Sequence, residues 1–100
     1  MAATPEKKVK QRVVAQLKEL GAYYFYPVSG GFATSGVPDI VCCYQGRFIG
    51  IECKAGKGKT TALQDKNLKE ISEAGGLAMV VNEENVEQIT AVLTDLLKSY

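Results

Sequence analysis

The chain has 100 residues, of which 46% are hydrophobic, and its formal net charge is +1. This length is enough for one small buried core, so we expect a single domain over residues 1–100. The near-neutral charge excludes a general attraction to polyanions, although basic residues are concentrated at 6–12 and 54–59. No apolar run is long enough to cross a bilayer or to resemble a signal peptide. We therefore expect a cytoplasmic protein without a membrane partner.

Histidine is absent, and the three cysteines at positions 42, 43 and 53 lack the spacing of a metal site. The sequence therefore argues against structural zinc and against catalysis by a histidine base or a cysteine–histidine pair. Free cysteine is among the most buried residue types, so we interpret all three cysteines as small core residues.

The signals of successive elements follow one another without a linker or a repeat. Thr4, Pro5 and Glu6 are typical of a helix start, and Gly21 is typical of its end. The elements expected next are a strand at 22–28, a loop at 29–36, strands at 38–44 and 47–54, a helix from Thr61 to Gly75, a buried strand at 77–81 and a last helix capped by Asn82. This α-β-β-β-α-β-α order predicts an α/β fold with one mixed sheet flanked by helices.

The hairpin at 38–54 can be counted residue by residue. If Gln45 and Gly46 form its turn, Asp39 lies directly opposite Glu52, and Lys54 points to the same face. Directly opposed residues have Cβ atoms about 4.5–5.5 Å apart. The other face is expected to be pure core and holds Ile40, Cys42, Ile49, Ile51 and Cys53. Because Val41, Cys43 and Phe48 make the acid face apolar as well, we expect helices over both faces and the acids at one end of the sheet.

Two opposed carboxylates in a partly dry place repel each other unless a proton, a cationic side chain or a metal ion compensates them. Lys54 can neutralise only one of the two charges. Carboxylates together with a backbone carbonyl suit a hard cation such as Mg²⁺, or Mn²⁺, and the carbonyl of Cys53 is placed to supply one ligand. Lys54 would then orient a nucleophilic water or stabilise charge that develops at phosphorus.

The segments "GVPD" (36–39) and "IECK" (51–54), with a helix before them and Gln64 on a helix after them, resemble the PD-(D/E)XK nuclease superfamily. Within it, the chain resembles the stand-alone VRR-NUC domains found in phages. It is also similar to archaeal-type Holliday junction resolvases, which share a Ser-Gly loop before the PD pair; here that loop is Ser29-Gly30-Gly31. The resemblance covers nearly the whole chain and implies a restriction-endonuclease-like core. It also implies a bacterial cell or a phage-infected host as the setting.

The resemblance implies a role for each matching position. Asp39 and Glu52 would bind the metal, Lys54 would be the catalytic lysine, and Gln64 would contact the water or the scissile phosphate. Glu6 would be an additional acid on the metal side, and Ser29, with Gly30 and Gly31, would face the DNA backbone. Lysines near the catalytic strand would contact phosphate, and we expect these to be Lys57, Lys59 and Lys66.

Each assignment has a structural alternative. Glu6 also suits the positive end of a helix dipole, and Thr61-x-x-Gln64 fits a capping box that needs no catalysis. The loop at 29–36 can be a connection without a DNA contact. Asp39, after Pro38, can simply end a turn, and Glu52 and Lys54 can form a solvated pair on a strand edge.

From these residues and this resemblance we expect a metal-dependent DNA endonuclease that acts on branched DNA such as four-way junctions. Paired cuts need two sites, so we expect a homodimer, with the aromatic run Tyr23–Tyr26 as its interface. No small-molecule cofactor is expected. The alternatives are a nicking or restriction-type nuclease on duplex DNA, an inactive nucleic-acid-binding module, and a domain whose acids are only structural.

Overall fold

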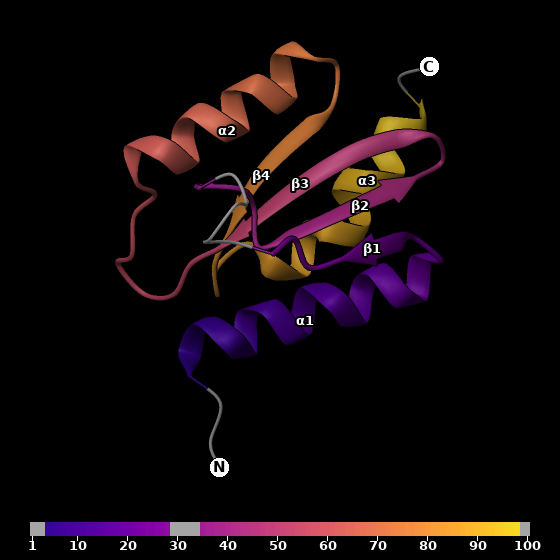
Figure 1. Cartoon of the computed structure of the whole chain (residues 1–100). Helices are drawn as coiled ribbons and strands as arrows, with labels where there is room; N and C mark the ends of the chain where they lie inside the picture. Colours follow the sequence, from indigo (N-terminus) through magenta and orange to yellow (C-terminus); the bar gives the residue numbers. More distant parts are fainter. Residues whose placement is uncertain (1–3, 29–34, 99–100) are drawn as a thin grey trace.

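The structure of the protein is a computed structural model that describes residues 4–28 and 35–98. Its elements are α1 (Pro5–Leu20), β1 (Tyr23–Phe25), β2 (Ile40–Tyr44), β3 (Arg47–Cys53), α2 (Ala62–Glu73), β4 (Leu77–Val81), the short 3₁₀ helix η1 (Val86–Gln88) and α3 (Ile89–Lys98). The four strands form one sheet in the order β1-β2-β3-β4 (Figure 1). Strands β3 and β4 are parallel, and the other pairs are antiparallel. The predicted α/β class, the mixed sheet and the element order are confirmed.

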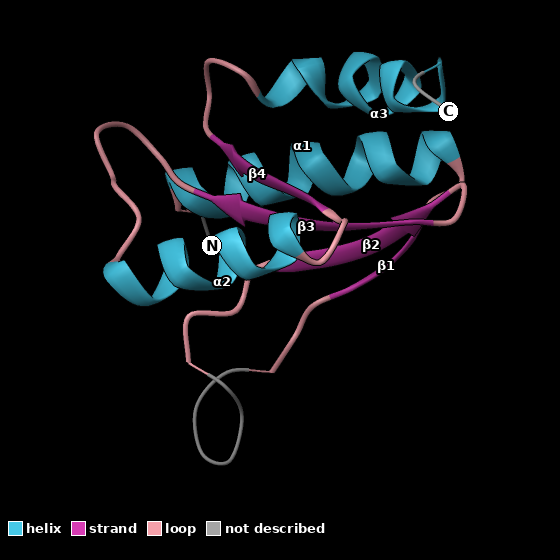
Figure 2. Ribbon diagram, turned by 90° about the horizontal axis from the view of Figure 1, so that it is seen from above, coloured by secondary structure: helices cyan, strands magenta, loops and turns pink. Residues whose placement is uncertain are grey.

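The sheet is the middle of three layers. Helices α1 and α3 lie on one face, and α2 lies on the other (Figures 1 and 2). The core fills the space between the sheet and the α1–α3 pair, and the expected core face of the hairpin lies there in full. The buried residues of this core are Val9, Val13, Val14, Leu17, Ile40, Cys42, Ile49, Ile51, Cys53, Val81, Val86, Ile89 and Leu93.

The hairpin between β2 and β3 has the register that the sequence count predicts. Gln45 and Gly46 form a two-residue turn with φ values of 52° and 80°, the left-handed conformations that a tight hairpin of this kind requires. Tyr44 pairs with Arg47, and the ladder runs on to the pair of Ile40 and Ile51. Asp39 directly precedes Ile40 and Glu52 directly follows Ile51, so the same register, continued by one position, sets the acids opposite each other.

Helix α1 is held at both ends and along its length. The Thr4 hydroxyl accepts the backbone N–H of Lys7 at 3.2 Å, and Gly21 ends the helix at φ 77°. The buried Gln16 side chain donates to the carbonyl of Val86 at 2.6 Å and accepts from the N–H of Thr90 at 3.1 Å. These bonds connect α1 to η1 and α3, and they fix the position of α1 against the sheet.

The structure corrects the expected start of the last helix. The side chain of Asn82 accepts the N–H groups of Glu84 and Asn85 at 2.9 and 3.3 Å, which closes a local turn instead of capping an α-helix. The 3₁₀ helix η1 follows, and α3 begins only at Ile89. Part of the predicted apolar stripe survives this shift, because Val86, Ile89 and Leu93 are fully buried.

Burial also differs from expectation at the sheet edges. Cys43 is exposed, so only Cys42 and Cys53 are the small core residues predicted for all three cysteines. Strand β4 is an edge strand rather than a buried one, and Val80 is 42% exposed. Helix α2 does not extend over β1 and β2, so helices cover only part of the sheet face that carries the acids. Within the described ranges, no helix combines the length and the apolar character that a membrane span requires.

Candidate metal-binding active site

The end of the hairpin is built by a side chain that replaces a backbone partner. Asp39 Oδ2 accepts the backbone N–H of Cys53 at 2.8 Å. Pro38, just before it, has no N–H to offer the ladder. Strand β2 therefore begins at Ile40 rather than at residue 38, and β3 ends at Cys53. The carboxylate of Asp39 is thus held at the point where the two strands part.

Glu52 is a carboxylate inside the protein, with only 2% of its surface exposed. Its Oε2 atom accepts a hydrogen bond from Gln64 Nε2 at 3.2 Å and lies 3.4 Å from Lys54 Nζ. The pKa of Glu52 is raised to about 7, first by burial and then by the charge and hydrogen bond of Asp39, while Lys54 opposes the rise. In the absence of a metal ion, Glu52 therefore holds a proton part of the time at neutral pH.

Gln64 completes the predicted capping box and at the same time reaches the acidic site, while its contact with the water or the scissile phosphate stays a prediction. Its Oε1 atom accepts the N–H of Thr61 at 2.9 Å, while its own N–H donates to the Thr61 hydroxyl at 3.2 Å, which completes the capping box. Its Nε2 atom remains available and contacts Glu52. The start of α2 is therefore bonded directly to the acidic site.

Glu6 comes to the same place from the first turn of α1. Oxygen atoms of Glu6, Asp39 and Glu52 all lie within 4.8 Å of one another. The sheet supplies two of these acids and a separate helix supplies the third, so the cluster depends on the packing of α1 beneath the sheet. Their role as ligands stays a prediction, as does that of the Cys53 carbonyl.

The donor set fits a hard divalent cation. Three carboxylates face one paired ammonium group, which leaves an excess of two negative charges when all three acids are ionised. The buried Glu52 has a strongly raised pKa, the sign of a charge that lacks full compensation in the metal-free chain. Oxygen ligands around such a site are those that Mg²⁺ and Mn²⁺ prefer.

The structure places some of the residues predicted to contact DNA on its surface, and others lie outside the described residues. Lys57 and Lys59 are exposed in the loop that follows β3, and Lys66 is exposed on α2. Ser29, Gly30 and Gly31 lie outside the described residues. None of these lysines takes part in the acidic cluster, and their contact with phosphate stays a prediction.

Two contacts that support the site escaped the sequence analysis. Glu83 accepts the N–H of Gly56 with both carboxylate oxygens at 3.0 Å, and so ties the loop after β3 to the loop after β4. Gly36 adopts φ 81°, and a Cβ atom there would lie 2.7 Å from the backbone carbon of Leu63 in α2. The glycine just before the PD pair was a usable signal for the second contact. The first joins segments far apart in the chain and left no local signal.

Comparison with known proteins supports the fold. No family model and no curated protein matches the sequence. Among solved structures, a VRR_NUC domain shares 21% identity over 87% of this chain and 95% of its own, with a TM-score of 0.72. A VRR_NUC domain protein shares 19% identity over 98% of this chain and 92% of its own, with a TM-score of 0.66.

A third structure is Hjc from Archaeoglobus fulgidus, a Holliday junction resolvase of an archaeal hyperthermophile. It shares 20% identity over 76% of this chain and 66% of its own, with a TM-score of 0.57. The resemblance drawn from the two sequence segments is therefore confirmed at the level of structure. This chain has the restriction-endonuclease-like fold of the VRR_NUC domain, which the archaeal resolvase shares.

Proposed function

We propose that this protein is a metal-dependent endonuclease that hydrolyses phosphodiester bonds in DNA. The proposal depends mainly on one observation, the cluster of side chains at the open end of the hairpin. Asp39, Glu52 and Glu6 lie together there, and Lys54 and Gln64 contact Glu52. A buried acid with two donors and two acidic neighbours is a costly arrangement for stability alone. The VRR_NUC-like fold and the Holliday junction resolvase among its structural neighbours support the same interpretation.

Each residue has a task in this reaction. Asp39, Glu52, the backbone carbonyl of Cys53 and Glu6 would hold Mg²⁺ or Mn²⁺. When bound, such an ion lowers the pKa of water and stabilises the charge of the phosphoryl group. Lys54 donates to the nucleophilic water or to the phosphoryl oxygen, from a position set by its ion pair with Glu52. Gln64 keeps the Glu52 carboxylate oriented through its amide.

The substrate we propose is branched DNA such as a four-way junction. The archaeal neighbour is named a Holliday junction resolvase. Recognition would rely on phosphates and on shape, with the exposed lysines Lys57, Lys59 and Lys66 as the proposed phosphate contacts. The segment Ser29-Gly30-Gly31 would add backbone contacts.

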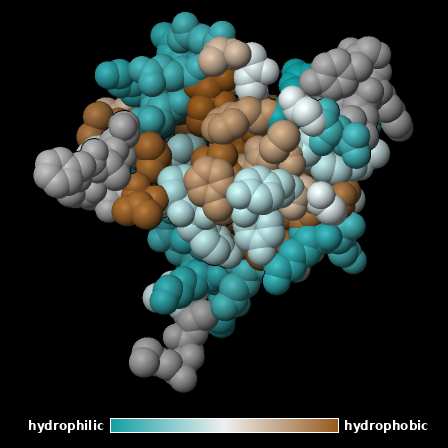
Figure 3. Space-filling view, turned by 45° about the vertical axis from the view of Figure 1, so that its right-hand side comes forward, coloured by the Kyte–Doolittle hydropathy of each residue, from teal (hydrophilic) through white to brown (hydrophobic). Residues whose placement is uncertain are grey.

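A homodimer would provide the two sites that paired cuts require. The sheet divides the aromatic run between its two faces. Tyr23 and Phe25, which are 73% and 50% exposed, lie on the outer face together with Phe48, also 50% exposed. Figure 3 shows an apolar area in the middle of the visible face, above the hydrophilic surface of α1. We assign the dimer contact to this outer face of Tyr23, Phe25 and Phe48.

Cleavage of a labelled four-way junction, with a flap as a second branched substrate and linear duplex and single strand as controls, tests the proposal. With Mg²⁺ or Mn²⁺ we expect symmetric cuts in the junction and little cutting of the linear duplex. Lys54→Ala should remove cleavage, whereas Lys69→Ala, which changes an exposed lysine away from the cluster, should keep it. Equal cutting of every substrate would contradict the preference for branches.

Thermal unfolding provides a second measurement that does not depend on the choice of substrate. A divalent ion that binds only the folded chain raises its melting temperature by linkage. We expect millimolar Mg²⁺ to raise the melting temperature above that in EDTA, and Asp39→Asn to abolish the difference. Binding of junction DNA without cleavage, together with equal melting temperatures, would mean an inactive nucleic-acid-binding module instead.

A further inference from the structure

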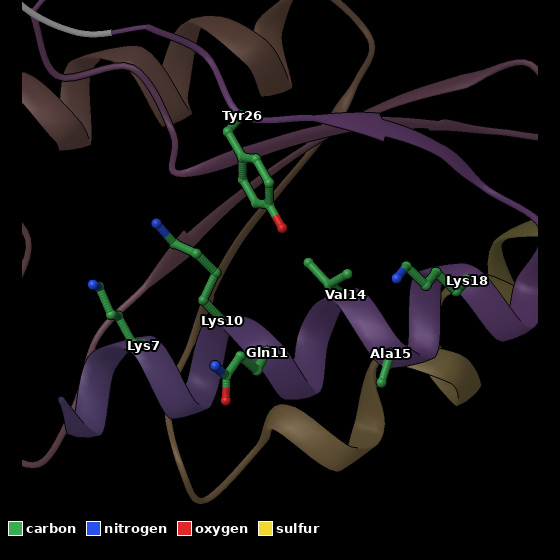
Figure 4. Close-up of a pocket in the computed structure, with 7 residues that line it drawn as sticks. All are labelled: Lys7, Lys10, Gln11, Val14, Ala15, Lys18 and Tyr26. Carbon is green, nitrogen blue, oxygen red and sulfur yellow. The ribbon is translucent and has the colours of Figure 1, made fainter. Parts of the chain in front are cut away.

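A groove of about 440 Å³ runs along α1. Six residues of α1 line it at helical spacing, and Tyr26 from the end of β1 completes it: Lys7, Lys10, Gln11, Val14, Ala15, Lys18 and Tyr26. Lys7, Lys10 and Val14 point to the side of the helix on which the Tyr26 ring stands (Figure 4). None of these described lining residues is acidic. Helical spacing has therefore gathered three lysines onto one side of a nearly neutral chain.

The lining combines cations with apolar surface. Lys10 Nζ lies 5.7 Å from the centre of the Tyr26 ring, and Tyr26 is 52% exposed. The ring of Tyr24 packs edge-on against that of Tyr26, with 6.1 Å between their centroids, which fixes its orientation. Val14 adds an apolar surface between the lysines. By contrast, Arg12 on another side of the same helix is already paired with Glu87.

This combination fits a single strand better than a duplex. A duplex presents its phosphates and sugars outward and keeps its bases stacked inside, so it needs cations but no aromatic wall. A single strand offers both phosphates and unstacked bases, which proteins bind with basic grooves and aromatic rings. The lysines complement the phosphates in charge, and the Tyr26 ring offers a base or sugar an apolar contact.

The groove begins beside the candidate active site. Glu6 of the acidic cluster directly precedes Lys7, the first lysine of the groove. From Lys7 to Lys18 the helix rises about 16 Å, enough to accompany roughly three to five nucleotides.

We propose that the α1 groove, formed by Lys7, Lys10, Val14, Lys18 and Tyr26, binds a single-stranded DNA segment that leads away from the cut site. The inference rests on the proposed nuclease function and specifies its substrate class, namely branched DNA with a single-stranded arm. Phosphates of the arm lie along the three lysines, and a base or sugar packs against Tyr26. A branch with such an arm is therefore bound more tightly than the same branch fully paired.

Fluorescence anisotropy of the full chain in EDTA tests binding without cleavage. The probes are a labelled 12-nucleotide oligothymidine, a duplex of equal length, and polyphosphate as an unlabelled competitor that has no bases. We expect the oligothymidine to bind more tightly than the duplex. Tyr26→Ala should weaken it at least about five-fold, and Tyr26→Phe, which keeps the ring, should change it less than about two-fold. Lys18→Ala should lower the slope of log affinity against log salt by about 0.7, whereas Lys69→Ala outside the groove should not.

The outcomes separate this inference from the nuclease proposal. Equal binding of single strand and duplex, or unchanged binding by Tyr26→Ala, would overturn the groove even if the protein cleaves DNA. Displacement of the labelled oligothymidine by polyphosphate as effectively as by unlabelled oligothymidine would show a general anion-binding surface. That result would also overturn the inference. If the protein binds the oligothymidine as expected but does not cleave DNA, the single-strand groove is supported and the proposed nuclease function is rejected. If Tyr26→Ala does not fold, as judged by circular dichroism, Lys18→Ala and the duplex comparison still decide.

Discussion

Glu52 shows how one residue can connect the stability of the protein with its proposed chemistry. Its carboxylate is buried, next to Asp39 and Glu6, and two donors reach only its Oε2 atom. In the metal-free chain, part of the compensation comes from a proton, because burial raises the pKa of Glu52 to about 7. A bound divalent cation would take the place of that proton, and metal affinity should therefore weaken as the pH falls below neutrality.

In EDTA, we expect the free energy of unfolding to fall as the pH rises from about 5 to about 7. The pKa of Glu52 is about 7 in the folded chain, above its ordinary value of 4.5, so the folded chain binds more protons than the unfolded chain over this range. The stability from this group is complete below pH 4.5 and is lost as the pH passes 7. The loss is at most about 3 kcal/mol. Urea unfolding at several pH values measures it.

Glu52→Gln provides the control for this pH dependence, because glutamine fills the same space and does not titrate. The slope between pH 5 and 7 should become shallower in this variant. Hydrogen bonds from the backbone N–H groups of Glu83 and Gly56 lower the pKa of Glu83, so that exposed acid titrates below this range. A slope that is the same in Glu52→Gln and the wild type would show that Glu52 is not its source.

At the scale of elements, the start of α2 is joined to the acidic cluster by one side chain and one close backbone contact. Gln64 closes the capping box and donates to Glu52. Gly36 packs against the backbone of Leu63 so closely that no Cβ atom fits. Gly36, the start of α2 and the end of β3 are therefore held against one another.

Substitution of Gln64 separates its two roles. Gln64→Ala removes both the cap and the donor, so it should lower the stability by about 1 kcal/mol and also slow cleavage. Gln64→Glu keeps an acceptor for the N–H of Thr61 but loses the amide that donates to Glu52. It should therefore keep the cap of α2, place a repelling carboxylate beside Glu52, and lose cleavage at least as strongly as Gln64→Ala. Urea unfolding measures the stability of the two variants, and cleavage rates at saturating Mg²⁺ measure their activity. Full activity in Gln64→Glu would leave Gln64 with a capping role alone.

Gly36→Ala tests the close contact between the loop and α2. A methyl group there meets the strain of φ 81° and also the Leu63 backbone at 2.7 Å. Gly21→Ala is a matched control, because Gly21 has φ 77° and no atom within 4 Å of its Cβ position. We expect the control to lose about 1–2 kcal/mol from strain, and Gly36→Ala to lose a further 1–3 kcal/mol from overpacking. Cleavage should fall only in Gly36→Ala. Equal losses of stability, measured by urea unfolding, would argue against the contact.

At the scale of the whole molecule, the helices divide the surface into functional regions. Helices α1 and α3 close one face of the sheet, and α2 covers only part of the other (Figure 2). The uncovered part, near β1, holds a hollow of about 280 Å³ that Phe25, Phe48 and Ile71 help to line. The basic groove lies on the α1 side instead. A dimer through the outer face would thus leave the groove and the acidic cluster open to DNA.

We expect the protein to be a dimer at micromolar concentration and Phe25→Asp to be a monomer. A buried charge in the centre of an apolar interface is strongly unfavourable. Light scattering coupled to size-exclusion chromatography gives the mass, and circular dichroism checks that the variant is folded. Val80→Asp changes an exposed apolar residue on the opposite edge strand and should keep the mass of the wild type. A monomeric wild type, or a dimer that tolerates Phe25→Asp, would contradict the assigned interface.

Local chemistry was sufficient for the element order, the caps of α1 and α2, and the register that sets Asp39 opposite Glu52. Each depends on neighbours in sequence, such as a turn residue, a cap or an alternating strand. Local reasoning was wrong at Asn82, because its side chain closes a turn with Glu84 and Asn85 that competes with a helix start. It was wrong at Cys43 too, since exposure depends on how far α2 extends across the sheet.

Tertiary packing alone brought Glu6 to the two hairpin acids, Gln64 Nε2 to Glu52, and Glu83 to Gly56. These contacts join residues far apart in the chain, and no periodicity or spacing encodes the distance between a helix and a sheet. The same holds for the Tyr26 ring above the lysines of α1, which the sequence presented as separate surface charges and an aromatic run. The sequence thus determined which groups are available for the proposed chemistry, and the packing of α1 and α2 on opposite faces of the sheet decided which of them meet.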